Sequence, residues 1–195
     1  MSDLILASAS PRRKELLEQI AVKFTCSPMD VDESRLPGEG AVAYVQRLAQ
    51  AKALAAIPKA NGLPVLGSDT IVLLHGELLG KPQDEKAAKV MLEALSGQSH
   101  KVVTGISLCR KLNGELKVLN DVVTTEVHFA ELSSAQIWTY VKTGESMDKA
   151  GAYGIQGKAA VFIESIEGSY SNVVGLPLLE TSRLLEQFNV PIWQE

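Results

Sequence analysis

The chain has 195 residues, 46% of them hydrophobic, and a formal net charge of −4. This length and hydrophobic content predict one domain over residues 1–195, built as two lobes. The acidic charge excludes a general nucleic-acid binder, which would need a basic surface. The sequence has no run of about 18 apolar residues, and its start, MSDLILASAS, lacks the regions of a signal peptide. We therefore expect a cytoplasmic protein without a membrane or nucleic-acid partner.

The first predicted elements are the strand Leu4–Ala7 and a helix from Pro11 to about Ile20. Ser10 suits the N-cap of this helix, and Pro11 suits its first position. The first helical turn is cationic, with Arg12, Arg13 and Lys14. Carboxylates are preferred at this positive end of the helix dipole. A bound phosphate would remove the conflict, whereas the alternative is a solvated basic turn.

Next we predict the strand Val22–Cys26, an acidic loop and the helix Ala41–Ile57. The loop places Glu33 close to two aspartates, which would suit a divalent metal but equally a solvated loop. Lys52 falls within the apolar stripe of the helix. It must either reach into a cleft, where phosphate or carboxylate would pair with it, or extend past the edge of the core.

The most informative stretch is PVLGSDTIVLLHGELLGKP, residues 64–82. It predicts the buried strand Val65–Leu74, a turn and a short return strand. Asp69 lies in the middle of this apolar strand, where an unpaired carboxylate would cost several kcal/mol by order of magnitude. Gly67 removes bulk on the same face, which predicts that another group comes close to the strand there. Lys81 supplies a nearby opposite charge. The alternatives to a functional site are a structural ion pair and a turn cap.

The second half of the chain continues the mixture of helices and long strands. The predicted elements are the helix Glu85–Leu95, the strands Lys101–Arg110 and Glu115–Ala130 around an Asn113-Gly114 turn, the helix Ser133–Thr143, the strand Ala159–Ile166, the helix Leu178–Phe188 and a loose tail, 189–195. The histidines have no second His or Cys at metal-ligand spacing, so no zinc site is expected. The glycine-rich loop 144–157 contains Gln156, whose amide could read a base edge by donating and accepting together.

This order of elements predicts an α/β fold: an elongated, mixed and twisted sheet with flanking helices, in two lobes around a central cleft. The polar candidates come from separate segments, mostly at element ends or in loops, as expected for residues that line a cleft. Cations suit a polyphosphate, carboxylates suit a metal and a base, and the Gly/Gln loop suits a nucleobase. The combination is typical of a nucleotide hydrolase. The candidates are Ser8, Arg12, Arg13, Glu33, Lys52, Asp69, Lys81 and Gln156.

Several segments together resemble the Maf family. They are LASASPRRKELL, RLAQAKA, LGSDTIV, LGKP, DKAGAYGIQG and GSYSNVVGLPL, and the resemblance spans about Leu4 to Phe188. It implies a nucleoside triphosphate pyrophosphatase, with a divalent metal (Mg²⁺ or Mn²⁺) and often a homodimer. It places the proton acceptor at Asp69. The other catalytic or cleft residues that it implies are Ser8, Arg13, Glu33, Lys52 and Lys81.

The resemblance also bears on the substrate. Arg12, Thr70 and Gln156 look like the set in the branch that acts on dTTP and UTP. Ser68 departs from the family, because a small alanine is common before the aspartate. The expected function is therefore hydrolysis of dTTP and UTP, or of modified pyrimidine triphosphates, in house-cleaning of the nucleotide pool.

In the expected mechanism, the amides of the first helix and Arg13 hold phosphates, and Lys52 and Lys81 neutralise charge in the transition state. Glu33 and Asp69 are the expected metal ligands. Two alternatives remain: a non-catalytic nucleotide-binding regulator of septum formation in cell division, and a phosphatase that removes the terminal phosphate.

Overall fold

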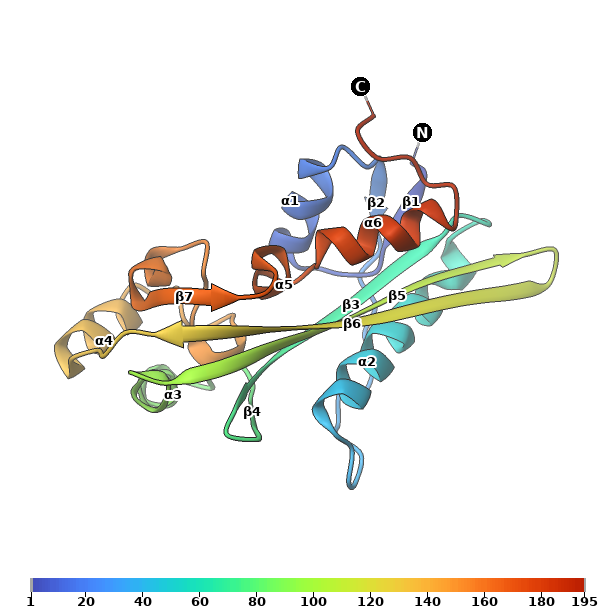
Figure 1. Ribbon diagram of the computed structural model, residues 1–195. Helices are drawn as coiled ribbons and strands as arrows, with labels where there is room; N and C mark the ends of the chain where they lie inside the picture. Colours follow the sequence, from blue (N-terminus) through green and yellow to red (C-terminus); the bar gives the residue numbers. More distant parts are fainter. Residues whose placement is uncertain (1, 195) are drawn as a thin grey trace. The chain divides into compact units, whose positions relative to one another are not determined.

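The computed structural model describes residues 2–194, in which seven strands form one sheet (Figure 1). The strands are β1 (Leu4–Leu6), β2 (Phe24–Cys26), β3 (Val65–Leu74), β4 (Glu77–Leu79), β5 (Ser99–Leu112), β6 (Glu115–Phe129) and β7 (Ile163–Glu167). Their order is β2-β1-β3-β5-β6-β7, and β4 pairs with β3. β1 is parallel to β2 and β3, whereas β4 and β7 pair antiparallel to their neighbours. The predicted mixed α/β fold is confirmed.

Helices flank this sheet. They are α1 (Pro11–Gln19), α2 (Ala41–Ala56), α3 (Glu85–Leu95), α4 (Ser134–Val141), α5 (Tyr170–Val174) and α6 (Leu178–Glu186), with the short 3₁₀ helices η1 (Ile57–Lys59), η2 (Ala150–Ala152) and η3 (Lys158–Phe162). The predicted N-caps Ser10 and Ser133 each accept a backbone N–H, from Arg13 and Gln136 respectively. Among the helices of residues 2–194, none combines the length and apolar character that a bilayer crossing would need.

The chain forms two compact units, which we call unit 1 and unit 2. Unit 1 contains residues 2–69, 104–123 and 175–194, and unit 2 contains residues 70–103 and 124–174. The strands β3, β5 and β6 contribute residues to both units. The single-domain organisation and the central cleft stay predictions.

In unit 1, two successive helical connections between parallel strands run in opposite directions across the sheet. The chain passes from β1 through α1 to the edge strand β2, and then returns through α2 to β3 on the other side of β1. Because such crossovers are right-handed, α1 and α2 lie on opposite faces of the sheet, as Figure 1 shows. The carboxyl end of β1, beside β3, is therefore a topological switch point, which is where open α/β sheets bind ligands.

The backbone of α2 lies directly on the sheet at Gly67 of β3. A Cβ at this position would overlap the carbonyl oxygen of Ala49 and would lie 2.7 Å from the nitrogen of Ala53. The sequence predicted a close approach here, and the approaching group is the helix backbone of the same chain. This contact brings the side chain of Lys52 in α2 next to Asp69 in the middle of β3.

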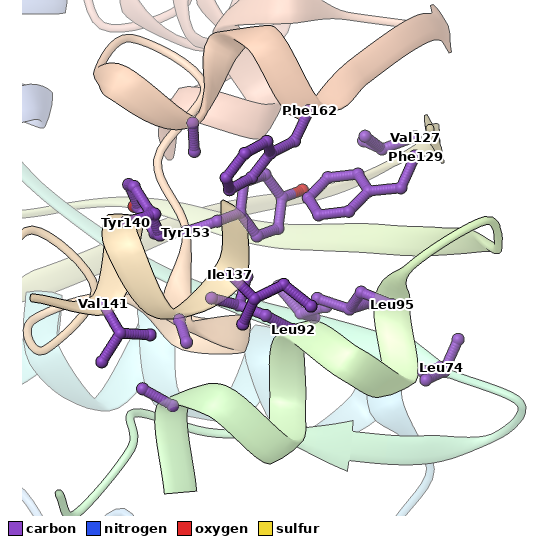
Figure 2. Close-up of a cluster of buried hydrophobic side chains, with 14 of the residues drawn as sticks. Leu74, Leu92, Leu95, Val127, Phe129, Ile137, Tyr140, Val141, Tyr153 and Phe162 are labelled. Atoms are coloured by element: carbon purple, nitrogen blue, oxygen red, sulfur yellow. The ribbon is translucent and has the colours of Figure 1, made fainter. Parts of the chain in front are cut away.

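Unit 2 has its own hydrophobic core, which α3, α4 and the strands around them enclose (Figure 2). Leu92 and Leu95 of α3 pack with Ile137 of α4, and all three are buried. Phe129 and Tyr153 add an edge-to-face pair, with 4.8 Å between ring centroids. This core supports the glycine-rich loop, because Tyr153 belongs to that loop.

The predicted strand Ala159–Ile166 is wrong in its first half, which forms the 3₁₀ helix η3 before β7 begins. Ala159 and Phe162 are the buried residues of η3. Their spacing matches the three-residue turn of a 3₁₀ helix rather than the alternation of a strand. Helix α5 was not predicted, and its start is capped by Ser169, whose hydroxyl accepts the N–H of Asn172 at 3.2 Å.

The C-terminal tail, predicted to be loose, is hydrogen-bonded to the start of the chain as far as residue 194. Val190 is 5% exposed, and the N–H of Trp193 donates to the carbonyl of Ile20 at 2.8 Å. The side chain of Gln194 donates to Asp3 at 2.9 Å. These contacts have partners far away in the sequence, so local composition did not reveal them.

Candidate active site

The loop after β1 carries Ser8 and the capped start of α1. The Ser8 hydroxyl accepts from Nη1 of Arg13 and from the N–H of Ser10, each at 3.2 Å. Nε of Arg13 donates to the carbonyl of Gly175 at 2.8 Å, and the Ser68 hydroxyl donates to the same carbonyl at 3.2 Å. Arg13 therefore ties this loop, at the end of β1, to the segment before α6.

Lys52 forms the centre of a charged cluster in unit 1. Its ammonium lies 2.7 Å from a carboxylate oxygen of Asp69 and 2.7 Å from one of Glu33. The side chains of Lys52 and Asp69 are each 12% exposed, whereas that of Glu33 is 59% exposed. Lys52 thus pairs with two carboxylates and does not extend into solvent.

The charge balance around Arg13 connects this cluster with the loop after β1. Burial lowers the pKa of the Arg13 guanidinium, and the nearby charge of Asp69 acts in the opposite direction. Arg12 lowers the same pKa further, and Glu33 raises it. The predicted residues Ser8, Arg12, Arg13, Glu33, Lys52 and Asp69 therefore belong to one electrostatic neighbourhood of unit 1.

The acidic loop is held against α2 by residues that the sequence analysis did not single out. The Tyr44 hydroxyl donates to the carbonyl of Glu33 at 2.8 Å. Arg47 donates to the carbonyl of Ser34 at 3.0 Å and to both carboxylate oxygens of Glu39 at 2.6 and 2.7 Å. The hydrogen bond from Arg47 lowers the pKa of Glu39 to about 2. The i, i+3 spacing of Tyr44 and Arg47 indicates only that both side chains lie on one helix face, and not that they contact the acidic loop.

The remaining predicted residues belong to unit 2. Thr70 directly follows Asp69 in β3, and Lys81 and Gln156 are exposed residues of two loops. These two loops meet, because the N–H of Gly151 donates to the carbonyl of Gly80 at 3.1 Å. The structure thus joins the loop of Lys81 to the glycine-rich loop of Gln156 within one unit.

The site offers few protein ligands for a metal ion. Within residues 2–194, no group of three or more His, Cys, Asp or Glu side chains is arranged to hold a metal ion. Glu33 and Asp69 nevertheless converge on one point, the ammonium of Lys52. Mg²⁺ is commonly held by one or two carboxylates plus substrate phosphates and water. This donor set therefore fits a metal that arrives with a phosphorylated substrate.

Comparison with known proteins gives consistent results. The family model described as "Maf-like protein" matches residues 3–188. A "dTTP/UTP pyrophosphatase" of Yersinia pestis bv. Antiqua is 52% identical over 189 residues, covering 96% of this chain and 94% of the relative. Proteins of the same name from Saccharophagus degradans and Symbiobacterium thermophilum are 50% and 51% identical, over 99% of this chain and 92% and 97% of their own lengths. The chain belongs to the Maf family.

Proposed function

We propose that this chain is a nucleoside triphosphate pyrophosphatase that hydrolyses dTTP and UTP to the monophosphate and pyrophosphate. The observation that carries the proposal is the shared contact of Lys52 with Glu33 and Asp69. Two carboxylates and a cation meet at Asp69, which lies in β3 beyond Leu66, the last residue paired with β1. A capped helix N-terminus follows β1. The similarity to relatives named "dTTP/UTP pyrophosphatase" supports two parts of the proposal: that the bond between the α- and β-phosphates is broken, and that the substrate carries thymine or uracil.

In the proposed reaction, Ser8, Arg13 and the first amides of α1 bind phosphate oxygens. A divalent cation, Mg²⁺ or Mn²⁺, would be held by Glu33 and Asp69 and would neutralise charge on the triphosphate. Lys52 and Lys81 stabilise the negative charge that develops as pyrophosphate leaves.

Asp69 is the proposed proton acceptor. Its carboxylate takes a proton from the water that attacks the α-phosphorus. The ion pair with Lys52 positions the carboxylate, since Asp69 has little freedom at 12% exposure. General-base catalysis of this kind contributes roughly 10²–10⁴ to the rate.

The proposed base-binding residues are Arg12, Thr70 and Gln156. The amide of Gln156 can donate to one atom of a pyrimidine edge and accept from the next. Replacing all three residues should change the preference between UTP and CTP, and an unchanged preference would contradict the assignment. We further propose a cytoplasmic location and a homodimer, without a nucleic-acid or membrane partner.

Product analysis with Asp69→Asn tests the function. The wild-type protein, incubated with each common nucleoside triphosphate and Mg²⁺ or Mn²⁺, should form dTMP or UMP and pyrophosphate. Asp69→Asn should lose about 10²–10⁴ in turnover while remaining folded. Asp121→Asn is the matched control, because Asp121 accepts a hydrogen bond from the adjacent Val122 N–H, which an asparagine oxygen can also accept.

The other outcomes identify the rival functions. A nucleoside diphosphate and orthophosphate would show that the enzyme is a terminal phosphatase. Tight binding of nucleotide without turnover, in both the wild type and Asp69→Asn, would favour a nucleotide-binding regulator. Near-wild-type turnover of Asp69→Asn would remove Asp69 from the role of base.

A further inference from the structure

Gln156 occupies a tight turn of unit 2. The N–H of Gly157 donates to the carbonyl of Gly154 at 3.1 Å, which places Ile155 and Gln156 at the two corners of a four-residue turn. The Gln156 side chain is exposed. The conformation of this turn therefore determines where the Gln156 amide can reach.

The first and last residues of the turn, Gly154 and Gly157, each contact a charged side chain from the preceding part of the loop. A Cβ at Gly157 would overlap the carboxylate of Glu145, with 2.5 Å to its Cδ. A Cβ at Gly154 would lie 2.6 Å from Cε of Lys149. Gly157 has a φ of −103°, which other residues adopt readily. A side chain at 157 would thus have to displace the Glu145 carboxylate from its place against the turn, whereas the φ angle itself would not exclude other residues.

Glu145 also binds the turn through hydrogen bonds from two different elements. One carboxylate oxygen accepts from the N–H of Lys158, directly after the turn, at 3.1 Å. The other accepts from the hydroxyl of Tyr140 in α4 at 3.2 Å. The carbonyl of Glu145 accepts from the ammonium of Lys149 at 2.6 Å.

Tyr140 connects this arrangement to the core of unit 2. It is 4% exposed and packs edge-to-face on Phe162, with 5.2 Å between centroids (Figure 2). Burial raises the pKa of its hydroxyl, and the charge of Glu145 raises it further. The hydroxyl therefore stays protonated and remains a donor to Glu145, so the carboxylate is anchored in a rigid part of the unit.

Base selection needs such an anchor. Uracil and thymine present an N–H donor beside a carbonyl acceptor, whereas cytosine presents the reverse pattern. An amide can match either pattern by rotating, so it discriminates only where its position is restricted. A displacement of about 1 Å at such a site can change rates by up to about 10²-fold.

We propose that Glu145 is a positioning residue that holds the Gly154–Gly157 turn, and with it Gln156, in the conformation that selects uracil and thymine over cytosine. This inference rests on the proposed function, in which Gln156 reads the base. Glu145 acts through the turn and does not contact the reacting atoms.

The test measures the ratio of kcat/KM for UTP to that for CTP in Glu145→Ala, Glu145→Gln, Gly157→Ala and the double variant Glu145→Ala/Gly157→Ala. Glu145→Ala should lower the ratio about tenfold, mainly through KM for UTP. Glu145→Gln should lie between, because its one amide oxygen can accept from only one of the two donors. Glu164→Gln is the matched control, since Glu164 is exposed on β7.

The double variant gives the sharpest result. Gly157→Ala alone should lower the ratio because its methyl group needs the space of the carboxylate. In the Glu145→Ala background the same change should have almost no further effect. Additive effects of the two changes, or an unchanged ratio in Glu145→Ala, would overturn the proposal.

Hydrogen exchange makes the test independent of turnover. The Lys158 amide should exchange at least about tenfold faster in Glu145→Ala, because it loses its acceptor. In an Asp69→Asn background, the dissociation constant for CTP divided by that for UTP should fall in parallel with the kinetic ratio. A wild type that forms no monophosphate would contradict the proposed function, whereas unchanged exchange or unchanged binding selectivity in Glu145→Ala would overturn this inference.

Discussion

At the scale of single residues, Lys52 is the cation that holds the two carboxylates of the site together. Its ammonium forms ion pairs with Glu33 and Asp69, each at 2.7 Å. Two carboxylates that converge without a cation between them repel each other. Lys52 therefore has a structural function in the free protein, besides its proposed role with the triphosphate.

Replacing Lys52 by methionine should lower the free energy of unfolding by about 3 kcal/mol. This is the lower end for a broken buried pair, because Glu33 remains in contact with water. Urea unfolding measures the change. In the Asp69→Asn background the same replacement should cost clearly less, and an equal cost in both backgrounds would mean that the pair with Asp69 contributes little.

His100 should make the stability of the protein depend on pH below neutrality. Its Nε2 lies 2.7 Å from the hydroxyl of Tyr153, and within residues 2–194 its buried Nδ1 has no hydrogen-bond partner. Burial lowers the pKa of His100 from 6.5 to about 4, and His128 adds to the shift. The unfolded chain thus binds a proton at a higher pH than the folded one, so stability falls as the pH drops through this range.

Between pH 7 and pH 5, His100 should remove about 2 kcal/mol from the free energy of unfolding. His100→Gln, which cannot titrate, should lack this part of the pH dependence. Urea unfolding at a series of pH values tests the difference. Parallel pH profiles for the two proteins would contradict the role of His100.

At the scale of elements, the contact between α2 and β3 brings the cluster together. Lys52 belongs to α2 and Asp69 to β3, and the helix backbone touches the strand at Gly67. The nearest atoms are backbone atoms, which cannot move aside as a flexible side chain would. The register between helix and strand therefore determines the distance between Lys52 and Asp69.

Gly67→Ala should destabilise the protein by about 3 kcal/mol through overpacking. It should also lower kcat, because the helix must move away from the strand that carries Asp69. Gly80→Ala is a control for stability, since a Cβ there meets nothing within 4 Å. A loss of stability with unchanged kcat would mean that the helix position does not matter for the reaction.

At the scale of the whole molecule, the proposed substrate contacts are distributed over two compact units. Ser8, Arg13, Glu33, Lys52 and Asp69 belong to unit 1, whereas Thr70, Lys81 and Gln156 belong to unit 2. Asp69 and Thr70 are adjacent in β3, at the point where the chain passes from one unit to the other.

UTP with Mg²⁺ at about 100 times its dissociation constant should raise the free energy of unfolding of Asp69→Asn by about 2.7 kcal/mol. This variant avoids turnover during the measurement. Hydrogen exchange should slow around residues 8–14 of unit 1 and around residues 80–82 and 154–158 of unit 2. Slowing confined to unit 1 would contradict the roles proposed for Lys81 and Gln156.

Much of the secondary structure was predictable because its signals are local. The strand Val65–Leu74 and the helix Glu85–Leu95 have the predicted bounds. The Asn113-Gly114 turn joins β5 and β6 as predicted, with positive φ at both residues. The segment around η3 was mistaken for a strand because short apolar runs suit several conformations, and only packing against the unit 2 core distinguishes them.

The sequence by itself determined which residues are out of place: a carboxylate in an apolar strand, a lysine in an apolar helix stripe and cations at a helix N-terminus. Each conflicts with a local rule, so each is visible without coordinates. Only the tertiary structure decided how they pair. Lys52 contacts Asp69 and Glu33, and Arg13 contacts Gly175, and in each case the partners come from distant segments of the chain. The hold of Tyr44 and Arg47 on the acidic loop, and of Glu145 on the Gln156 turn, likewise depends on packing, because no local pattern specifies which distant backbone groups a side chain will meet.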